Sequence, residues 1–106
     1  MRERAYQAEL IKKLRDLFPG CVILKNDSSY MQGVPDLIIL YGRFWAMLEV
    51  KATRGSRVQP NQEYYVDQLN EMSFAAFIYP ANEEEVLHAL QLAFNLEGDS
   101  RVSQRQ

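Results

Sequence analysis

Residues 33–51 read GVPDLIILYGRFWAMLEVK, two apolar runs with a short turn between them. The first run covers residues 37–40, the second covers residues 44–48, and the turn contains a glycine and an arginine. Apolar runs of this length, joined this tightly, are typical of a β-hairpin whose interior lies in the core. The rest of the chain is therefore expected to form around this hairpin.

Three charged residues interrupt the hairpin: Asp36 before the first strand, and Glu49 and Lys51 at the end of the second. Because the turn folds the chain back, we expect Asp36 to lie close to Glu49. Glu49 and Lys51 are two positions apart, so they share one face of the strand at a spacing of roughly 6.6 Å. Charged groups at the edge of a buried sheet are costly unless they are compensated.

A divalent cation would compensate the two carboxylates. Oxygen ligands from Asp36 and Glu49, with a main-chain carbonyl near Val50, are the type that Mg²⁺ prefers, and Mg²⁺ keeps water molecules for contacts with substrate phosphates. Lys51 would then lie beside the ion, where it could hold an attacking water or neutralise charge on a phosphate. The alternative is a structural ion pair that closes the hairpin.

The spacing of these residues resembles the signature of the PD-(D/E)xK nuclease superfamily. Pro35-Asp36 is followed, thirteen positions after the aspartate, by Glu49-Val50-Lys51. Within that superfamily, the chain resembles the small stand-alone VRR-NUC endonucleases and the phage Holliday-junction-resolvase-like endonucleases. The wider resemblance covers roughly residues 2–79 and includes Gly33, Gly55 and Gln62.

The resemblance implies a Mg²⁺-dependent endonuclease that hydrolyses phosphodiester bonds of DNA, with Mn²⁺ able to replace Mg²⁺. It implies that Asp36 and Glu49 hold the metal and that Lys51 assists the nucleophile. An acid on the first helix, here Glu3, would support this metal or a second ion. Gln62 would make a polar contact with Lys51 or with the attacking water. Branched DNA, such as a four-way junction, is the substrate that the resemblance favours.

Residues 2–18 are expected to form a helix, because apolar residues recur at helical spacing and a Pro-Gly pair follows. Glu3 lies in line with the apolar stripe through Leu10, so we expect it to face the sheet. Glu9 points about 120° away from Glu3. It precedes Lys13 by four residues, which predicts an ordinary surface ion pair.

Two polar segments near the predicted site are candidates for contacts with the DNA backbone. Residues 21–25 predict a short buried strand, and a polar connection follows it. Candidates at the mouth of the site are Lys25, Ser28, Ser29 and Tyr30; an ordinary exposed loop is an equal alternative. The flexible basic loop after Lys51 carries Arg54 and Arg57, the best candidates in the chain for phosphate contacts.

The remaining elements are a helix, a strand and a last helix. Pro60 suits the first turn of a helix that carries Gln62 near its start. Residues 74–79 predict a buried strand. Asn82 is expected to cap the last helix, whose acidic first turn is favoured by the helix dipole. His88 falls on the side opposite to the apolar face of that helix, and it is assigned no catalytic role.

This order of elements predicts an α/β fold. The expected architecture is a small three-layer sandwich in which a mixed central sheet of about four strands has helices on both faces. The resemblance implies that the sandwich is restriction-endonuclease-like. Residues 1–96 are expected to form a single nuclease domain, and residues 97–106 a polar, flexible tail.

The composition is that of an ordinary globular domain, with 106 residues, 47% of them hydrophobic and 25% charged. No apolar run approaches the length of a membrane span and no signal-peptide pattern is found, so we expect no membrane association. The single cysteine, Cys21, predicts a reducing, cytoplasmic setting, and the resemblance implies a bacterial or phage-infected host. One cysteine and one histidine leave no ligands for a structural zinc site.

The net charge of −2 is unevenly distributed. Residues 1–57 contain ten Lys/Arg and six Asp/Glu, a net charge of +4, whereas residues 58–106 contain two and eight, a net charge of −6. Three of the six acids in the basic half are the candidate metal ligands Glu3, Asp36 and Glu49. With a metal bound, that half would be still more positive, which is the charge expected for phosphate binding.

We also expect a homodimer, because a four-way junction is resolved by two paired cuts that two identical sites related by a two-fold axis can make. Apolar side chains that one small core would not hide support this expectation; they are Phe44, Trp45, Met47, Tyr64 and Tyr65. The main alternative function is a non-catalytic nucleic-acid-binding or assembly module that retains the nuclease fold. A sequence-specific restriction nuclease is disfavoured, because the chain is too short for a separate recognition region.

Overall fold

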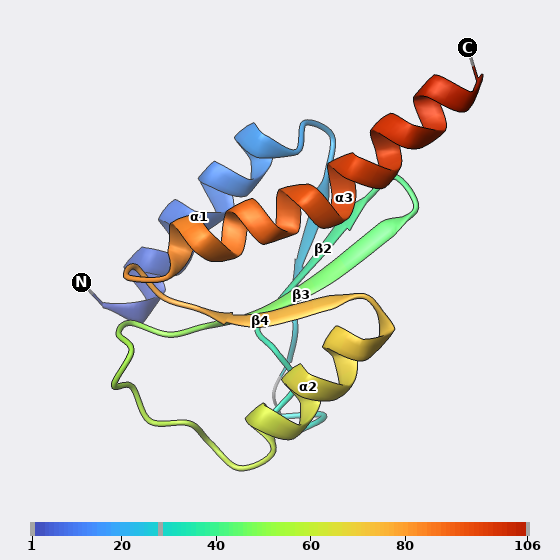
Figure 1. Cartoon of the computed structure of the whole chain (residues 1–106). Helices are drawn as coiled ribbons and strands as arrows, with labels where there is room; N and C mark the ends of the chain where they lie inside the picture. The colour runs from blue at the N-terminus through green and yellow to red at the C-terminus, as the bar shows by residue number, and fades with distance from the viewer. Residues whose placement is uncertain (1, 28, 106) are drawn as a thin grey trace.

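The computed structural model describes the backbone of residues 2–27 and 29–105, and the side chains of residues 2–27 and 29–94. Within this part of the chain, three helices and four strands are found (Figure 1). In chain order they are α1 (Glu3–Leu17), β1 (Val22–Lys25), β2 (Leu37–Tyr41), β3 (Phe44–Val50), α2 (Gln62–Met72), β4 (Phe74–Ile78) and α3 (Glu83–Arg105).

The strands form one mixed sheet in the order β1-β2-β3-β4. The first three strands are antiparallel neighbours, and β4 runs parallel to β3 after a crossover through α2. Helices α1 and α3 cover one face of the sheet, and α2 packs on the other face over β3 and β4 (Figure 1). The predicted α/β sandwich with a mixed four-stranded sheet is therefore confirmed.

The main core lies between the sheet and the two helices α1 and α3. Every second residue of β2 and β3 points into it, because side chains alternate between the two faces of a strand. At one end, the ring of Phe94 packs against Phe18, Tyr41 and Phe44 at centroid distances of 5.2–5.9 Å. The buried residues of this core are Tyr6, Leu10, Leu14, Phe18, Leu37, Ile39, Ala46, Leu48, Val50, Ile78, Val86, Leu87, Leu90 and Phe94.

The prediction that the first strand is buried is wrong. Val22 is 51% exposed and Leu24 is 46% exposed, because β1 lies at the edge of the sheet and α2 packs over β3 and β4 instead. Leu40 of the neighbouring strand is 38% exposed for the same reason. The five apolar residues expected at the surface are mostly covered: Tyr64 is exposed, and Phe44, Trp45, Met47 and Tyr65 are half-buried.

Helix α1 is fastened to the start of α3 rather than stabilised by the expected Glu9–Lys13 pair. The Lys13 Nζ atom lies 2.6 Å from Glu83 Oε2, and the Tyr6 hydroxyl donates to Glu83 Oε1 at 2.8 Å. Burial and the hydrogen bond to Glu83 raise the pKa of Tyr6, so this hydroxyl keeps its proton. Packing between the two helices brings Glu83 to Lys13, and helical periodicity within α1 does not reveal such a contact.

Asn82 directly precedes α3, as expected of a capping residue, but its side chain makes other hydrogen bonds. Its Oδ1 accepts from the backbone N–H of Tyr79 at 2.8 Å, and its Nδ2 donates to the Phe77 carbonyl at 3.1 Å. The amide therefore ties the start of α3 to the end of β4. His88 is exposed, as predicted.

Helix α2 begins two residues later than the position of Pro60 indicates. Asn61 precedes it with φ of 72°, in the left-handed region. The backbone of Gly33, with φ of +95°, packs directly on this residue: a Cβ built on Gly33 would lie 2.7 Å from Asn61 Cβ and 2.9 Å from the Pro60 carbonyl oxygen. The loop before β2 and the start of α2 are thus in close backbone contact.

The expected boundary at residue 96 is not an end of α3, whose backbone continues to Arg105. The side chains of the expected tail, residues 97–106, lie outside the described part of the chain, so the flexibility of this tail stays a prediction. Among the described residues, no helix combines the length and the apolar character that a membrane span requires.

We expect Gly33→Ala to destabilise the protein more than Gly42→Ala. Gly42 also has positive φ, +61°, but a Cβ there would meet nothing within 4 Å. Both substitutions force alanine into the left-handed region at a cost of about 1–2 kcal/mol. In Gly33→Ala the new methyl group also overlaps with Asn61, and overpacking of this kind lowers the free energy of unfolding by roughly a further 1–3 kcal/mol. Urea unfolding of both variants measures the difference, and equal losses would contradict the close packing of Gly33 on Asn61.

Candidate active site

The hairpin brings Asp36 and Glu49 together, as the sequence predicts. Leu37 pairs with Leu48 across β2 and β3, so the next residues outward, Asp36 and Glu49, lie opposite each other. The Asp36 Oδ2 atom accepts a hydrogen bond from the backbone N–H of Val50 at 2.8 Å, which fixes its carboxylate beside β3. Asn26 adds a second anchor, because its backbone N–H donates to the Asp36 carbonyl at 2.8 Å.

Glu49 is a buried carboxylate with an incomplete set of partners. It is 2% exposed, and its Oε2 accepts from Gln62 Nε2 at 2.9 Å and lies 3.7 Å from Lys51 Nζ. Its Oε1 is buried and has no hydrogen-bond partner among the described residues. A buried polar atom in this condition costs free energy unless an ion or a proton satisfies it.

The surroundings of Glu49 favour its neutral form when no cation is bound. The pKa of Glu49 is raised from 4.5 to about 8, and burial is the largest cause. The negative charge of Asp36 and a hydrogen bond that protonated Glu49 can donate to that carboxylate contribute to the same rise. Lys51 opposes these effects, and Glu3 adds a smaller increase. Two ionised carboxylates cannot hydrogen-bond to each other, so the pair needs a shared proton or a cation.

Lys51 and Gln62 form the other half of the site, and they confirm the predicted contact between them. Lys51 Nζ donates to Gln62 Oε1 at 2.8 Å and to the Arg57 carbonyl at 3.0 Å. The backbone N–H of Gln59 also donates to Gln62 Oε1 at 2.8 Å. Because Gln62 Oε1 accepts from Lys51 while its Nε2 donates to Glu49, the amide holds both charged groups in place.

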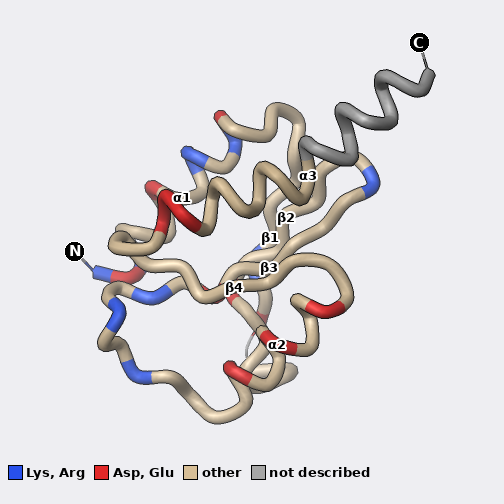
Figure 2. The backbone as a smooth tube through the Cα atoms, in the orientation of Figure 1, with Lys and Arg blue, Asp and Glu red and all other residues tan. Residues whose placement is uncertain are grey.

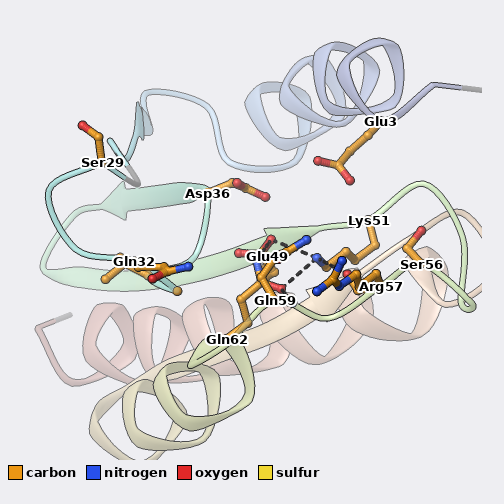
Figure 3. Close-up of a pocket in the computed structure, with 12 residues that line it drawn as sticks. Glu3, Ser29, Gln32, Asp36, Glu49, Lys51, Ser56, Arg57, Gln59 and Gln62 are labelled. Atoms are coloured by element: carbon orange, nitrogen blue, oxygen red, sulfur yellow. Dashed lines mark hydrogen bonds and ion pairs between the residues drawn. The ribbon is translucent and has the colours of Figure 1, made fainter.

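Glu3 lies at the border of the same site. It is the first residue of α1 and is exposed, and Figure 3 shows its carboxylate turned towards Asp36 and Lys51. Its charge contributes to the raised pKa of Glu49, which places it within electrostatic range. Glu9 is exposed and does not line the cleft. Glu3 therefore lines the cleft and Glu9 does not, as helical periodicity predicts, while the role of Glu3 towards a metal stays a prediction.

These residues line an open, polar cleft of about 720 Å³ (Figure 3). Its walls come from the start of α1, the loop before β2, the end of β3, the loop after β3 and the start of α2. The lining residues are Glu3, Ser29, Gln32, Gly33, Val34, Asp36, Glu49, Lys51, Ser56, Arg57, Gln59 and Gln62. A cleft of this size is within the usual range for ligand sites.

Only some of the candidates for DNA contacts reach this cleft. Arg57 and Ser29 line it, and the Ser29 backbone N–H and hydroxyl both donate to Asp27. Lys25 and Arg54 are exposed but are not among the lining residues. Ser28 lies outside the described residues. Val50, the candidate for a main-chain metal ligand, is not among the lining residues, so its role as a ligand stays a prediction.

Several lining residues were not found from the sequence. Gln32, Ser56 and Gln59 are polar residues in loops, where no periodicity indicates the direction of a side chain. The one local signal was the Gln-Pro-Asn-Gln run at residues 59–62, because asparagine tolerates the left-handed conformation that Asn61 adopts. That conformation starts α2 where Gln62 can reach Lys51.

The residues present fit a hard divalent cation with few protein ligands. No group of three or more His, Cys, Asp or Glu side chains converges as a metal-binding cluster in the described part of the chain. Asp36 and Glu49 nevertheless offer two carboxylates, one with a buried oxygen that lacks a partner. This donor set suits Mg²⁺, which is usually bound through one or two carboxylates and otherwise keeps water or substrate oxygens.

Comparison of the chain with protein-family models, curated protein sequences and solved structures gives no significant match. The function is therefore inferred from the residues of the cleft and from the sequence signature.

In metal-free buffer, the stability of the protein should decrease as the pH rises, because of Glu49. Its pKa is about 8 in the folded protein against an ordinary 4.5, so between these values the folded state holds a proton that the unfolded state has lost. The stabilisation is complete below pH 4.5 and is lost as the pH rises through about 8. The slope from this group should approach about 1.4 kcal/mol per pH unit.

Glu49→Gln is the matched control, since it has the same shape and no titrating proton. Urea unfolding in a chelator, from mildly acidic to mildly basic pH, should give a flatter profile for this variant. If both proteins showed the same slope, another group would be responsible, and the assignment to Glu49 would be wrong.

Proposed function

We propose that this protein is a Mg²⁺-dependent endonuclease that hydrolyses phosphodiester bonds of DNA, with Mn²⁺ able to replace Mg²⁺. One observation carries the proposal: a buried carboxylate with an unsatisfied oxygen, Glu49, lies opposite Asp36 and next to a fixed lysine, in an open polar cleft. A purely structural carboxylate is usually fully hydrogen-bonded, so this arrangement favours a ligand that brings positive charge.

Each residue of the site has a distinct part in this proposal. Asp36 and Glu49 hold the cation, which when bound supplies Lewis-acid polarisation of the phosphate. Lys51 neutralises negative charge that develops on the phosphoryl oxygens or holds the attacking water, and its ammonium is already oriented by Gln62. Glu3 adds a third negative charge at the border of the cleft and attracts the cation.

The distribution of charge around the cleft supports phosphate binding from one side. Figure 2 shows Lys and Arg along the loop between β3 and α2, and Asp and Glu on α2 itself. Arg57 lines the cleft, and Arg54 lies on the same loop. The outward residues of α2 include Glu63, Asp67 and Glu71, all exposed. DNA is therefore expected to approach over the loop and away from the outer surface of α2.

The sequence signature supports the same class of enzyme. Pro35-Asp36 and Glu49-Val50-Lys51 resemble the PD-(D/E)xK nucleases, and the α/β sandwich is compatible with a restriction-endonuclease-like arrangement. The resemblance to VRR-NUC and Holliday-junction-resolvase-like endonucleases favours branched DNA as the substrate. The free thiol of Cys21 agrees with a reducing, cytoplasmic setting.

We further propose that two copies associate through the exposed face of β1 and β2. Val22, Leu24 and Leu40 are apolar, so a second copy of the same face meets no like charge there. β1 is an edge strand, and strands at an edge readily pair with a second chain. Two copies related by a two-fold axis would present two identical clefts, as paired cuts at a junction require.

The activity is tested by incubating the protein with Mg²⁺ or Mn²⁺ and linear, nicked, flapped and four-way DNA. Cleavage should disappear in chelator and fall by more than about 100-fold in Asp36→Asn and Glu49→Gln, because even outer partners of metal sites contribute roughly 10–100-fold. Glu3→Gln should also be slow, whereas Glu9→Gln, a matched acid outside the cleft, should cleave normally.

The two outcomes that would overturn the proposal are distinct. Wild-type cleavage by Asp36→Asn or Glu49→Gln would mean that the ligands are wrongly assigned. DNA binding without cleavage under either metal would favour the alternative, a non-catalytic nucleic-acid-binding module with this fold.

The dimer is tested by light scattering at micromolar concentration. The wild-type chain of 12.3 kDa should show twice that mass, and Leu24→Glu should be monomeric, because it buries a charge in the shared face. Leu92→Glu is the matched control: Leu92 is 52% exposed on α3, outside this face, and its variant should remain dimeric. A monomeric wild-type protein, with and without junction DNA, would refute the dimer.

A further inference from the structure

A second hollow, of about 290 Å³, adjoins the cleft on the loop between β1 and β2. Val34 lines both spaces. Along the loop, residues of the cleft alternate with residues of the hollow: Ser29 and Gln32 belong to the cleft, while Tyr30 and Met31 belong to the hollow. The remaining lining residues of the hollow are Asn26 and Asp27. A single ligand could therefore occupy both spaces.

The hollow presents an aromatic ring to solvent. Tyr30 is 86% exposed and Met31 is 42% exposed, whereas Tyr64 on α2 is 60% exposed. Rings left in water forgo the free energy of burial. An exposed aromatic and a thioether side by side are a surface on which a flat, weakly polar group can stack.

The loop that carries this ring contains two hydrogen-bonded turns. The backbone N–H of Tyr30 donates to the Asp27 carbonyl at 3.1 Å, and the N–H of Val34 donates to the Met31 carbonyl at 3.4 Å. Beyond them, Gly33 packs directly on the backbone of Asn61. The backbone that carries the ring is thus held next to the cleft.

The charge at the hollow distinguishes a nucleobase from a phosphate. The two hydrogen bonds from Ser29 hold the pKa of Asp27 below its usual value, so its carboxylate is ionised at neutral pH. An ionised carboxylate repels a phosphate but accepts hydrogen bonds from the amino groups of a base. Phosphates are instead favoured on the cleft side, where Arg57 and Lys51 lie.

We propose that Tyr30 and Met31 form a stacking subsite for one unpaired nucleobase of the DNA whose backbone lies in the cleft. The inference rests on the proposed function and extends it to the form of the substrate. A base in continuous duplex is stacked between its neighbours and cannot cover the ring, whereas a base at a fork, flap or junction can. The subsite would therefore favour DNA with unpaired bases next to the scissile phosphate.

The test uses the fluorescence of 2-aminopurine, which is quenched when the base stacks. The probe is placed as an unpaired base at a fork, and Ca²⁺ replaces Mg²⁺. The wild-type protein should quench the probe. Tyr30→Ala should abolish the quenching and weaken fork binding by roughly 10-fold to 100-fold, with affinity for continuous duplex nearly unchanged. Tyr30→Phe keeps the ring and should behave as the wild type.

Tyr64→Ala is the matched control, because it removes another exposed tyrosine that lies outside the hollow. It should leave quenching and fork binding unchanged. Quenching that persists in Tyr30→Ala would overturn the subsite, and so would an equal loss of fork and duplex binding, which would indicate a backbone contact. Unfolding of Tyr30→Ala in urea should match the wild type, since the ring is largely in solvent.

This outcome is separable from that of the nuclease assay. Cleavage that depends on Asp36, with no effect of Tyr30→Ala on the probe, would overturn the subsite alone. Quenching that depends on Tyr30, with no cleavage under Mg²⁺ or Mn²⁺, would support the subsite and overturn the endonuclease. A wild-type protein that binds neither fork nor duplex would overturn both.

Discussion

The burial of the Glu49 carboxylate opposite Asp36 is the constraint on which the site depends. Two ionised carboxylates side by side repel each other, and burial is the largest cause of the raised pKa that favours the neutral form of Glu49. Neighbouring groups compensate these charges in part. The backbone N–H of Val50 donates to Asp36, the Gln62 amide donates to Glu49, and Lys51 lies further from Glu49. The Glu49 Oε1 atom has no hydrogen-bond partner among the described residues, so it requires an external cation or a proton.

The fold delivers these groups through strand register and a single crossover. Antiparallel pairing of β2 and β3 sets Asp36 opposite Glu49, and parallel pairing of β4 with β3 requires a connection that returns along the sheet. Helix α2 forms this connection, so its first residue, Gln62, lies near the end of β3. The packing of Gly33 on Asn61 then holds the start of α2 against the loop before β2. The cleft is thus fixed from two sides by backbone contacts.

The parts of this arrangement that were predictable from sequence are those set by local period. A tight hairpin has one register, which put Asp36 beside Glu49, and helical spacing separated Glu3 from Glu9. Long-range choices left no such signal. The run at residues 21–25 is equally apolar in an edge strand and in a central one, so the exposure of Val22 was missed. Lys13 bonds to Glu83, 70 residues away, because two helices pack together.

The same geometry speaks against the bland interpretation of these charges as an ion pair that closes the hairpin. In such a pair, the ammonium would contact the carboxylate directly and leave no oxygen unsatisfied. Here Lys51 Nζ is 3.7 Å from Glu49 Oε2, while its hydrogen bonds go to Gln62 and to the Arg57 carbonyl at 2.8 and 3.0 Å. Gln62 and the Arg57 carbonyl therefore hold the lysine beside the two carboxylates, and its ammonium makes no direct hydrogen bond to Glu49. A buried acid with incomplete compensation, next to a lysine that is oriented by neutral groups, lowers the stability of the protein. Local conflicts of this kind are expected where a ligand binds.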